Sequence, residues 1–482
     1  MISRRGFLGA SAGAALGALT ASACSTAPSG GQAAGAKTLR CWDHFQPRAD
    51  LHKKLFADFQ KSSGVAVEYT VYNPNQQGQA LQLAFGSKQL PDVFTTAGVQ
   101  LPHARLRKEG WLAPIEIEKE ALSAMPADVF LNGFTHFEDK LYSLPLVNFR
   151  QYSTLTWYNV ELATKAGLDP ERDLATWDGF RQAARKIEAA GGDGISGWIA
   201  PLQFAPRLGE HVTELSMAAG GVGAVDPRTG EYGHARDPFV HAIEFLVSLK
   251  KDGLLFPAST SLDARTSRAR WSTGVAGLFF DGPWNIGVVN DQFKSFLDKV
   301  GVAPIPTSEA GREAILYASP KAGDYCVAAT SQHQDQAAEL VKLFTSEEVM
   351  LAETEQMDGM PVNLDLVDKA KVHPTYKTAA GIFRRQVRLR PAAEVRNPGA
   401  SDVVAEMKQI EPNLGGIVQG VLSGQLKDVR KALKEYDAKL TAERDRAVKA
   451  VAAKGVEVTA DDWAFANWTP GQDYGRDKYK TS

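Results

Sequence analysis

The chain has 482 residues, of which 44% are hydrophobic and 23% are charged, an ordinary globular composition with enough length for two domains. Its 54 basic and 56 acidic side chains leave a formal charge of −2, with both signs interspersed along the sequence. A nucleic-acid-binding protein normally shows a basic stripe, so no nucleic-acid partner is expected.

The N-terminus has the pattern of an export signal. Arg4 and Arg5 precede a weakly apolar run rich in Ala and Gly, which is typical of twin-arginine signals that carry a folded chain across the cytoplasmic membrane. Small residues then lead to Cys24 as in a lipobox, with Ala21 in place of the usual leucine. We therefore expect residues 1–23 to be a cleaved signal peptide and Cys24 to carry a lipid that anchors the chain to the cell membrane, on its extracytoplasmic side.

Two other interpretations of this segment stay open. One is a soluble secretory peptide cleaved near the same place. The other is a single membrane span, which the run disfavours because it is shorter and less apolar than the roughly 20 residues that a crossing needs. Residues 24–36 lack apolar periodicity and are rich in Gly, Ala and Ser, so we expect a flexible linker.

The folded part begins at Lys37 with alternating strand and helix patterns. A short apolar run at 38–42 predicts a strand, an apolar face over 51–59 predicts a helix that Ser63-Gly64 ends, and alternation over 65–71 predicts a second strand. These three elements form a β-α-β unit. A further helix through Leu81 to Phe85 leads to a strand at 90–94.

The same alternation recurs in the middle of the chain. Thr176 is predicted to cap a helix over about 177–189, and Asp237 is predicted to cap a helix that begins with Pro238 and ends near Gly253. Residues 403–454 have a mainly helical pattern, followed by a tail rich in aromatic residues. The sequence therefore predicts two α/β regions with a helical C-terminal part.

Short motifs do not indicate a cofactor. Gly192 to Gly197 have the spacing of a dinucleotide-binding loop, but a helix precedes them and a strand follows, the reverse of the order that such a loop requires. The nine histidines and three cysteines lack metal-ligand spacings. Cys41 and Cys326 lie in apolar, strand-like segments, where buried thiols are favoured over a disulfide, although pairing stays open.

Several short segments in fixed order carry a family resemblance. They are Trp42-Asp43, 86–94, 110–115, 139–145, 157–159, 166–168, 176–180 and Gly274 to Trp284. On these segments the chain resembles the extracellular solute-binding proteins of ABC importers, in the sugar and oligosaccharide class that includes maltose-binding protein. The resemblance covers nearly the whole chain after the signal.

The resemblance implies an α/β fold of two lobes, the type II periplasmic-binding-protein fold, with a cleft and hinge between the lobes. The first lobe is expected to comprise 37–147 and 305–345, and the second 148–304 and 346–450. Residues 451–482 are expected to form a tail that packs on the body. Hinges are expected near 146–149, 304–306 and 345–347.

A sugar has apolar C–H faces and a belt of hydroxyls, so its pocket needs aromatic surfaces together with carboxylates, amides and guanidinium groups. By resemblance, Trp284 in its Gly-Pro-Trp turn is expected to stack on a sugar, the alternative being a plug between helices. Asp281 accepts sugar hydroxyls or merely caps that turn, Trp42 belongs either to the site or to the core, and Phe204 is a weaker candidate. The expected ligand-binding residues are Trp284, Asp43, Trp42, His44, Asp281, Asn148, Arg150, Gln151, Tyr152, Trp198 and Asn363.

These observations predict a monomeric, lipid-anchored receptor without enzymatic activity or cofactor, which captures a sugar or oligosaccharide and delivers it to the transmembrane subunits of an ABC permease. Three alternatives stay open. They are a receptor for another polar solute such as a polyol or phosphodiester, a secreted carbohydrate-active or cofactor-containing enzyme, and a sensory or adhesive surface protein. The loop Thr95 to Gln100 lacks the tryptophan and acid of maltose binders, which argues against maltose itself.

Overall fold

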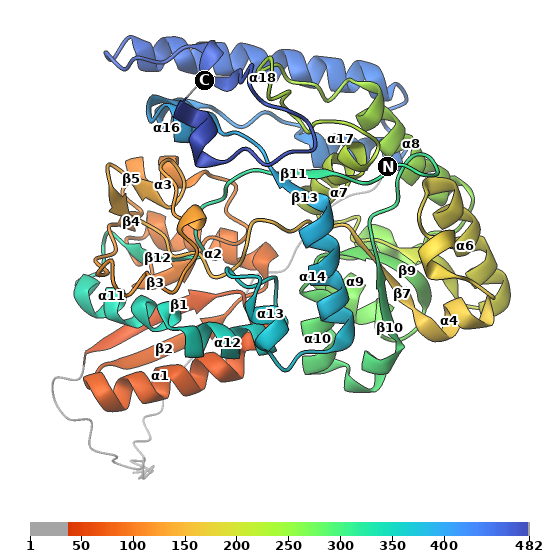
Figure 1. Cartoon of the computed structure of the whole chain (residues 1–482), viewed down its shortest axis with the longest axis horizontal. Coiled ribbons are helices and arrows are strands. Elements are labelled where there is room, and N and C mark those ends of the chain that lie inside the picture. The colour runs from red at the N-terminus through yellow and green to blue at the C-terminus, as the bar shows by residue number, and fades with distance from the viewer. Residues whose placement is uncertain (1–36, 481–482) are drawn as a thin grey trace, which may run out of the picture. The chain divides into compact units, whose positions relative to one another are not determined.

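The structure is a computed structural model that describes residues 37–480. The predicted signal peptide, Cys24 and the linker to residue 36 lie outside the described residues. Among the helices within 37–480, none combines the length and apolar character that a membrane crossing demands. Residues from Lys37 onward group into one unit, in which two β-sheets are surrounded by helices (Figure 1).

The first sheet has five strands in the order β2-β1-β3-β12-β4. Its strands are β1 (Thr38–Asp43), β2 (Ala66–Val71), β3 (Val93–Thr95), β4 (Leu112–Ala113) and β12 (Tyr325–Ala328). β1 pairs in parallel with β2 and β3, while the late strand β12 enters antiparallel between β3 and β4. Helix α1 (Ala49–Ser63) connects β1 to β2, and Gly64 ends it in the left-handed conformation that favours glycine. The predicted β-α-β unit is confirmed.

The second sheet has four strands in the order β10-β7-β9-β8. Its strands are β7 (Leu155–Asn159), β8 (Ser196–Ile199), β9 (Ala276–Asp281) and β10 (Val300–Ala303). Thr176 caps α6 (Trp177–Gly191) as predicted, because its side chain accepts a hydrogen bond from Gly179 N. The Gly192 to Gly197 motif lies in the turn from α6 into β8, which confirms an α-to-β turn.

One predicted helix start is wrong by a residue. Arg236 is the N-cap of α8 (Asp237–Lys251), and Asp237 is already helical. Instead of capping the helix, the Asp237 carboxylate pairs with Arg430 at 2.6 Å, a tertiary contact that the local sequence does not reveal. An acid in the first turn still interacts favourably with the helix dipole.

The chain crosses between the two sheets in several places. Leu144 bridges to Tyr325, Val147 bridges to Pro361, and β11 (Leu316–Ala318) pairs with β13 (Val387–Leu389). The Asp324 carboxylate accepts hydrogen bonds from the backbone N–H groups of Leu146 (2.6 Å) and Val147 (3.0 Å). These crossings hold the two sheets on either side of the site described below.

The remaining elements surround the sheets (Figure 1). The helices with connecting or covering positions are α2 (Pro74–Gly86), α3 (His103–Lys108), α4 (Val160–Lys165), α5 (Pro170–Asp173), α7 (Ala205–Ala218), α9 (Ala264–Trp271), α10 (Asn285–Gln292), α11 (Gln334–Lys342), α12 (Glu347–Glu355), α13 (Leu366–Lys369), α14 (Pro374–Gln386), α15 (Ala393–Arg396), α16 (Gly399–Glu406), α17 (Leu414–Leu422) and α18 (Val429–Ala452). Short elements are the hairpin β5 (His136–Phe137) and β6 (Lys140–Leu141) and the 3-10 helices η1 (Gln46–Arg48), η2 (Ala127–Val129), η3 (Pro257–Ser261), η4 (Lys294–Lys299), η5 (Leu343–Thr345), η6 (Ala460–Trp463) and η7 (Arg476–Lys480).

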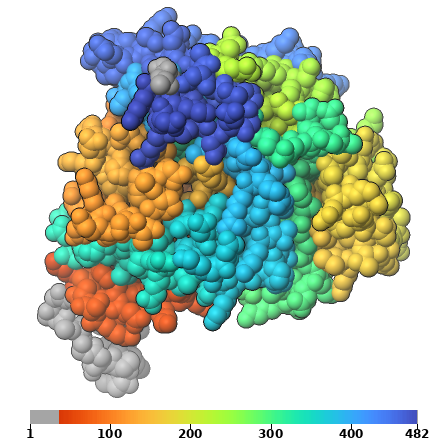
Figure 2. All heavy atoms as spheres, in the orientation of Figure 1, coloured from red at the N-terminus to blue at the C-terminus, as the bar shows by residue number. Residues whose placement is uncertain are grey.

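The C-terminal aromatic residues pack onto earlier parts of the chain. Phe465, Trp468 and Tyr474 are buried together and contact Val222 and Tyr317. In Figure 2 the dark blue C-terminal residues lie directly against the orange segment of the first half, where Arg476 donates to the backbone carbonyls of Ala127 and Phe130. Burial of aromatic surface of this kind stabilises the attachment by about 1.5–3 kcal/mol per side chain.

The two cysteines of the described chain lie on different faces of the first sheet. Cys41 of β1 is in register with Val93 of β3, whereas Cys326 of β12 is in register with Phe94, the next residue. Because successive strand residues point to opposite faces, the two thiols are separated by β3 and by the sheet itself. Both are buried and free, so the open disulfide question is settled against pairing.

Candidate functional site

A pocket of about 290 Å³ lies between elements of the two sheets. Its walls come from the ends of β1 and β2, from α7, α9 and α10 on the side of the second sheet, and from the crossing segments. The lining residues are His44, Phe45, Gln46, Pro47, Asn73, Pro74, Asn75, Ala97, Gly98, Gln100, Val147, Gln151, Phe204, Pro206, Arg207, Glu210, Ala264, Arg265, Arg268, Trp284, Val288, Asp358 and Gly359. We call this the first pocket.

Trp284 lines the first pocket with its ring held on several sides. Its indole Nε1 donates to Asp281 Oδ1 at 2.8 Å, and the same Asp281 carboxylate pairs through Oδ2 with Arg268 Nε at 2.6 Å. The guanidinium of Arg207 lies over the ring, 4.7 Å from its centroid. Sugar stacking on Trp284 therefore stays a prediction, and a ligand in this conformation meets a combined Arg207 and Trp284 surface.

Arg207 is poorly satisfied for a buried cation. Its side chain is 13% exposed, and its Nη1 lies 3.0 Å from Glu210 Oε2. Neither Nε nor Nη1 makes a well-directed hydrogen bond within the described residues, so the contact with Glu210 is electrostatic rather than a good hydrogen bond. Arg207 and Glu210 are one turn apart on α7 and together offer donors and acceptors to the pocket.

The start of α9 connects the two sides of the pocket. Asp263 forms a capping box with Thr266, and its other carboxylate oxygen accepts from the amides of Asn73 (3.3 Å) and Asn75 (3.2 Å) at the end of β2. Two residues further, Arg265 donates to the backbone carbonyls of His44 (3.2 Å) and Tyr72 (2.8 Å). The start of α9, on the side of the second sheet, is thus hydrogen-bonded to the segments that follow β1 and β2. The first pocket lies beside these contacts.

His44 and Gln151 supply neutral polar groups. His44 Nδ1 lies 2.9 Å from Thr95 Oγ1, and burial lowers the pKa of His44 to about 4, so its imidazole is neutral at pH 7. Gln151 Oε1 accepts a hydrogen bond from Met360 N at 2.9 Å, which leaves its amide N–H₂ for a ligand. Both residues were predicted from sequence and both line the first pocket.

A buried charge network underlies the pocket. Asp43 accepts hydrogen bonds from Tyr69 (2.9 Å) and Tyr325 (2.6 Å) and contacts His52 Nδ1 at 3.0 Å. His52 Nε2 in turn contacts Glu353 Oε1 at 2.8 Å. Burial works against a charged His52, but the Glu353 carboxylate and the hydrogen bonds from Glu353 and Asp43 outweigh it and raise the pKa of His52 to about 9.

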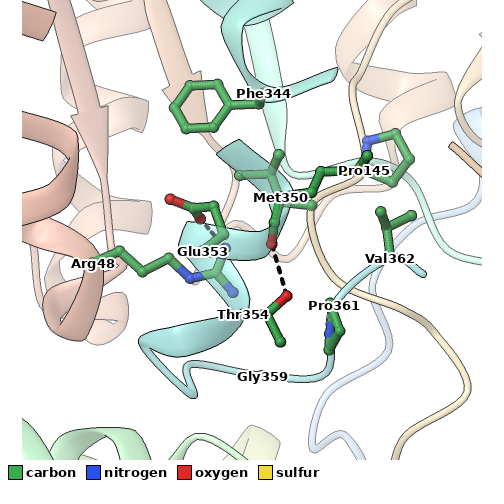
Figure 3. Close-up of a pocket in the computed structure, with 10 residues that line it drawn as sticks. Arg48, Pro145, Phe344, Met350, Glu353, Thr354, Gly359, Pro361 and Val362 are labelled. Carbon is green, nitrogen blue, oxygen red and sulfur yellow. Dashed lines mark hydrogen bonds and ion pairs between the residues drawn. The ribbon is translucent and has the colours of Figure 1, made fainter. Parts of the chain in front are cut away.

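Glu353 also holds Arg48, which is 2% exposed (Figure 3). Arg48 Nη1 lies 2.6 Å from Glu353 Oε2, its Nη2 donates to the carbonyl of Asp358, and its guanidinium covers Phe45 at 4.4 Å from the ring centroid. The cavity beside this pair measures about 10 Å³, which admits one water molecule at most and no solute. The network therefore supports the pocket wall at η1 without itself being a binding site.

Several predicted site residues lie elsewhere. Asp43 is fully buried in this network, Trp198 is buried in the core of the second sheet, and Trp42 packs against Tyr72 and the core beneath α2. Asp281 is 2% exposed and acts through Trp284 and Arg268. None of these four lines the first pocket.

Four others are occupied by structural contacts. Asn148 donates to Val362 O at 2.7 Å, and Tyr152 donates to Gln386 at 2.6 Å. Arg150 pairs with Asp473 of the C-terminal tail at 2.9 Å, and Asn363 accepts from Asp365 N at 3.1 Å. None of these four residues lines the first pocket.

Sequence patterns did not predict the pocket residues Arg207, Glu210, Arg265, Asn73 and Asn75. The Asp263 capping box is visible in the sequence as Asp-Ala-Arg-Thr, and it does predict a helix start with Arg265 in its first turn. Which surface that helix faces depends on how the two sheets are brought together, and no local pattern carries that information. The described residues contain no cluster of His, Cys, Asp and Glu that is suited to a metal ion.

The chain is similar in sequence and fold to known proteins. The model of a family described as bacterial extracellular solute-binding protein matches residues 46–351 of the chain. The sn-glycerol-3-phosphate-binding periplasmic protein of Brucella melitensis is 22% identical over 436 residues, covering 86% of this chain and 91% of that protein.

Solved structures match over similar lengths. An ABC transporter solute-binding protein of Thermotoga lettingae bound with alpha-D-tagatose aligns with a TM-score of 0.66 at 20% identity, covering 85% of this chain and 100% of the other. A sugar transporter of Arthrobacter chlorophenolicus with bound laminaribiose aligns with a TM-score of 0.65 at 20% identity, covering 84% and 99%. The predicted α/β fold of two lobes, like that of maltose-binding protein, is confirmed.

Proposed function

This chain belongs to the bacterial extracellular solute-binding proteins, and we propose that it captures a sugar or oligosaccharide for the permease of an ABC importer. In this proposal the chain is a receptor and catalyses no reaction. We propose that its two lobes comprise 37–147 with 305–345 and 148–304 with 346–450.

The first pocket is the observation that carries the proposal. It combines aromatic surface from Trp284 and Phe204 with a guanidinium, a carboxylate and a free amide, contributed by Arg207, Glu210 and Gln151. Aromatic rings complement the apolar faces of a sugar, while the polar groups pair with its hydroxyls. Few other small solutes use both kinds of surface in one pocket.

Closure of the lobes makes the capture selective. The contacts of Asp263 and Arg265 with the ends of β1 and β2 join the two sides next to the pocket. A ligand that contacts both sides stabilises this closed arrangement by the difference between its affinities for the closed and open states. His44 and Arg207 contact the ligand from opposite sides in this scheme.

The twin-arginine pattern and Cys24 bear on where the receptor is located. A twin-arginine signal exports the folded chain, and a lipid on Cys24 tethers the monomeric receptor to the extracytoplasmic face of the membrane through the linker 24–36. The tether raises the local concentration of the receptor near its permease without taking part in binding.

A phosphorylated polyol is a second candidate ligand class. The first pocket contains Arg207, Arg265 and Arg268, and of these Arg268 is neutralised by Asp281. Two arginines with incomplete partners favour an anionic group, and the Brucella relatives are described as sn-glycerol-3-phosphate-binding.

Isothermal titration calorimetry of the mature chain distinguishes these candidates. The panel contains neutral mono- and disaccharides, sugar phosphates and glycerol 3-phosphate, and mass spectrometry of each recovered ligand tests for turnover. We expect a neutral sugar to bind in the micromolar range or tighter, and Arg207→Gln to weaken it at least tenfold, about 1.4 kcal/mol. Arg270→Gln, on the exposed face of α9, is the matched control and is expected to leave binding unchanged.

Two results contradict the proposal. Binding of the phosphorylated compounds alone favours the second candidate. Chemical conversion of any bound sugar shows an enzyme rather than a receptor.

A further inference from the structure

A second pocket of about 580 Å³ adjoins the first. His44, Ala97 and Glu210 line both pockets, so the two volumes meet at these residues. The first pocket alone, at about 290 Å³, is at the lower limit of about 300 Å³ for small-molecule sites, whereas both together fall well inside the usual range. The continuous space therefore exceeds what one small solute fills.

The outer wall of the second pocket comes from the C-terminal part of the chain. Glu394 of α15 and Val404 of α16 face loop residues 95–102 and the first residues of α3 across the cavity. This wall is firmly attached, because Gln409 donates to the carbonyl of Gln100 at 2.7 Å and Ala405 is buried in the same core cluster as Leu106.

A close backbone approach fixes the position of α15 as well. A Cβ atom added to Gly133, which also lines the second pocket, would lie 2.5 Å from Glu394 Cβ and 2.8 Å from Ser401 Oγ. Gly133 also has a φ of 81°, a left-handed conformation that favours glycine. Both the lack of space for a Cβ atom and the backbone conformation therefore require glycine at this position. The turn at residue 133 therefore packs closely against α15 and α16, and together they form one continuous wall of the second pocket.

The polar groups of the second pocket suit a neutral, hydroxyl-rich group. Glu210, Asp324 and Glu394 are acceptors and Lys321 is a donor, while the hydroxyls of Thr95 and Thr96 already pair with the side chains of Gln77 and His103. His103 is buried with Nε2 2.9 Å from Thr96 Oγ1, and burial lowers its pKa to about 4, which leaves it uncharged. Three carboxyl groups against one lysine disfavour an anionic group at this end, in contrast to the arginines of the first pocket.

We propose that one ligand occupies both pockets, so that the protein binds a chain of at least two sugar units and the wall of α15 and α16 selects for the second unit. The inference rests on the proposed function of sugar capture. One unit lies against Arg207 and Trp284, the linkage passes His44 and Glu210, and the next unit lies against Glu394 and Val404.

The test is calorimetry of the mature chain with three matched series of increasing length. The probes are glucose, maltose and maltotriose; glucose, laminaribiose and laminaritriose; and xylose, xylobiose and xylotriose. In the series that binds, the disaccharide is expected to bind at least tenfold more tightly than the monosaccharide. Val404→Trp, which fills the second pocket, is expected to abolish this difference while leaving the affinity for the monosaccharide within twofold.

Val404→Ala is the control for this variant, since it keeps the pocket open and should retain the preference for length. Circular dichroism and thermal melting check that each variant folds. Glu394→Gln, which removes one acceptor from the same wall, is a second variant; it is expected to lose a smaller amount of affinity, and only for the disaccharide.

Equal affinity for mono- and disaccharide, or a Val404→Trp variant that weakens both alike, overturns the two-pocket inference and leaves the proposed function standing. Failure of every sugar in the panel to bind overturns both.

Discussion

Glu353 is the residue whose loss should most disturb the support of the site. Its two carboxylate oxygens hold two buried cations, Arg48 at 2.6 Å and His52 at 2.8 Å. Burial alone would raise the pKa of Glu353, but the charges of His52 and Arg48 outweigh it and lower that pKa, so the carboxylate is ionised. Glu353→Gln keeps the shape of the side chain and removes the charge.

The size of the effect follows from these contacts. The rise of the His52 pKa from the ordinary histidine value of 6.5 to about 9 corresponds to about 3 kcal/mol at 1.36 kcal/mol per unit. Removing one partner of a buried ion pair typically costs about 3–5 kcal/mol, against about 0–1 kcal/mol for a surface pair. We therefore expect Glu353→Gln to lower the free energy of unfolding by about 3–5 kcal/mol at pH 7.

The pH dependence provides a sharper check. Because the pKa of His52 is raised in the folded state, its contribution to stability is fully present below pH about 6.5 and is lost as the pH rises through about 9. The difference between wild type and Glu353→Gln should therefore shrink between pH 7 and pH 10, leaving the part that belongs to Arg48.

Urea denaturation followed by tryptophan fluorescence at pH 6, 7 and 10 measures this difference. Glu348→Gln, an exposed glutamate in the first turn of the same helix, is the control and should change stability by less than about 0.5 kcal/mol. A loss below 1 kcal/mol for Glu353→Gln at pH 7, or an equal loss at pH 7 and pH 10, would refute the assignment of a buried charge network.

Three other predictions concern buried or terminal groups. Burial raises the pKa of Glu214 to about 7, so the folded state loses stability as the pH rises from about 4.5 to 7. In urea titrations, Glu214→Gln should therefore be about 2–3 kcal/mol more stable than wild type at pH 8 but little different at pH 4.5. Equal gains in stability at both pH values would contradict this prediction. Cys41 and Cys326 should react with a thiol reagent only after unfolding, and unreduced protein that yields no free thiols would be inconsistent with the structure. Cys24→Ser should release the exported protein from membranes and abolish palmitate labelling; unchanged membrane retention would argue against the lipid anchor.

Local patterns in the sequence predicted the elements well because the signals for them are local. The alternation at 65–71, the Gly64 stop and the Thr176 cap each describe contacts within a few residues, and each corresponds to an observed element. Asp237 shows the limit of this reasoning, since a distant arginine on α18 takes the carboxylate that looked like a cap.

The site was harder to predict because it depends on how distant segments are brought together. Asp43 follows β1 at the edge where ligands are expected, but Tyr69, Tyr325 and His52 surround it, so it organises the wall from behind. Arg207, by contrast, lies in an ordinary helix and becomes important only because α7 packs beside Trp284 and places the guanidinium over the indole ring. In both cases the role of the residue depends on its burial and on its contacts with distant residues. A short stretch of sequence encodes neither property.

A crystal structure of the mature protein with its tightest-binding sugar would show directly where the ligand binds. We predict that the sugar lies in the first pocket, with Arg207 and Trp284 on one side and His44 on the other, and that the contacts of Asp263 and Arg265 are intact. A sugar bound elsewhere, or a pocket in which Arg207 and His44 both remain out of reach of the ligand, would contradict this prediction.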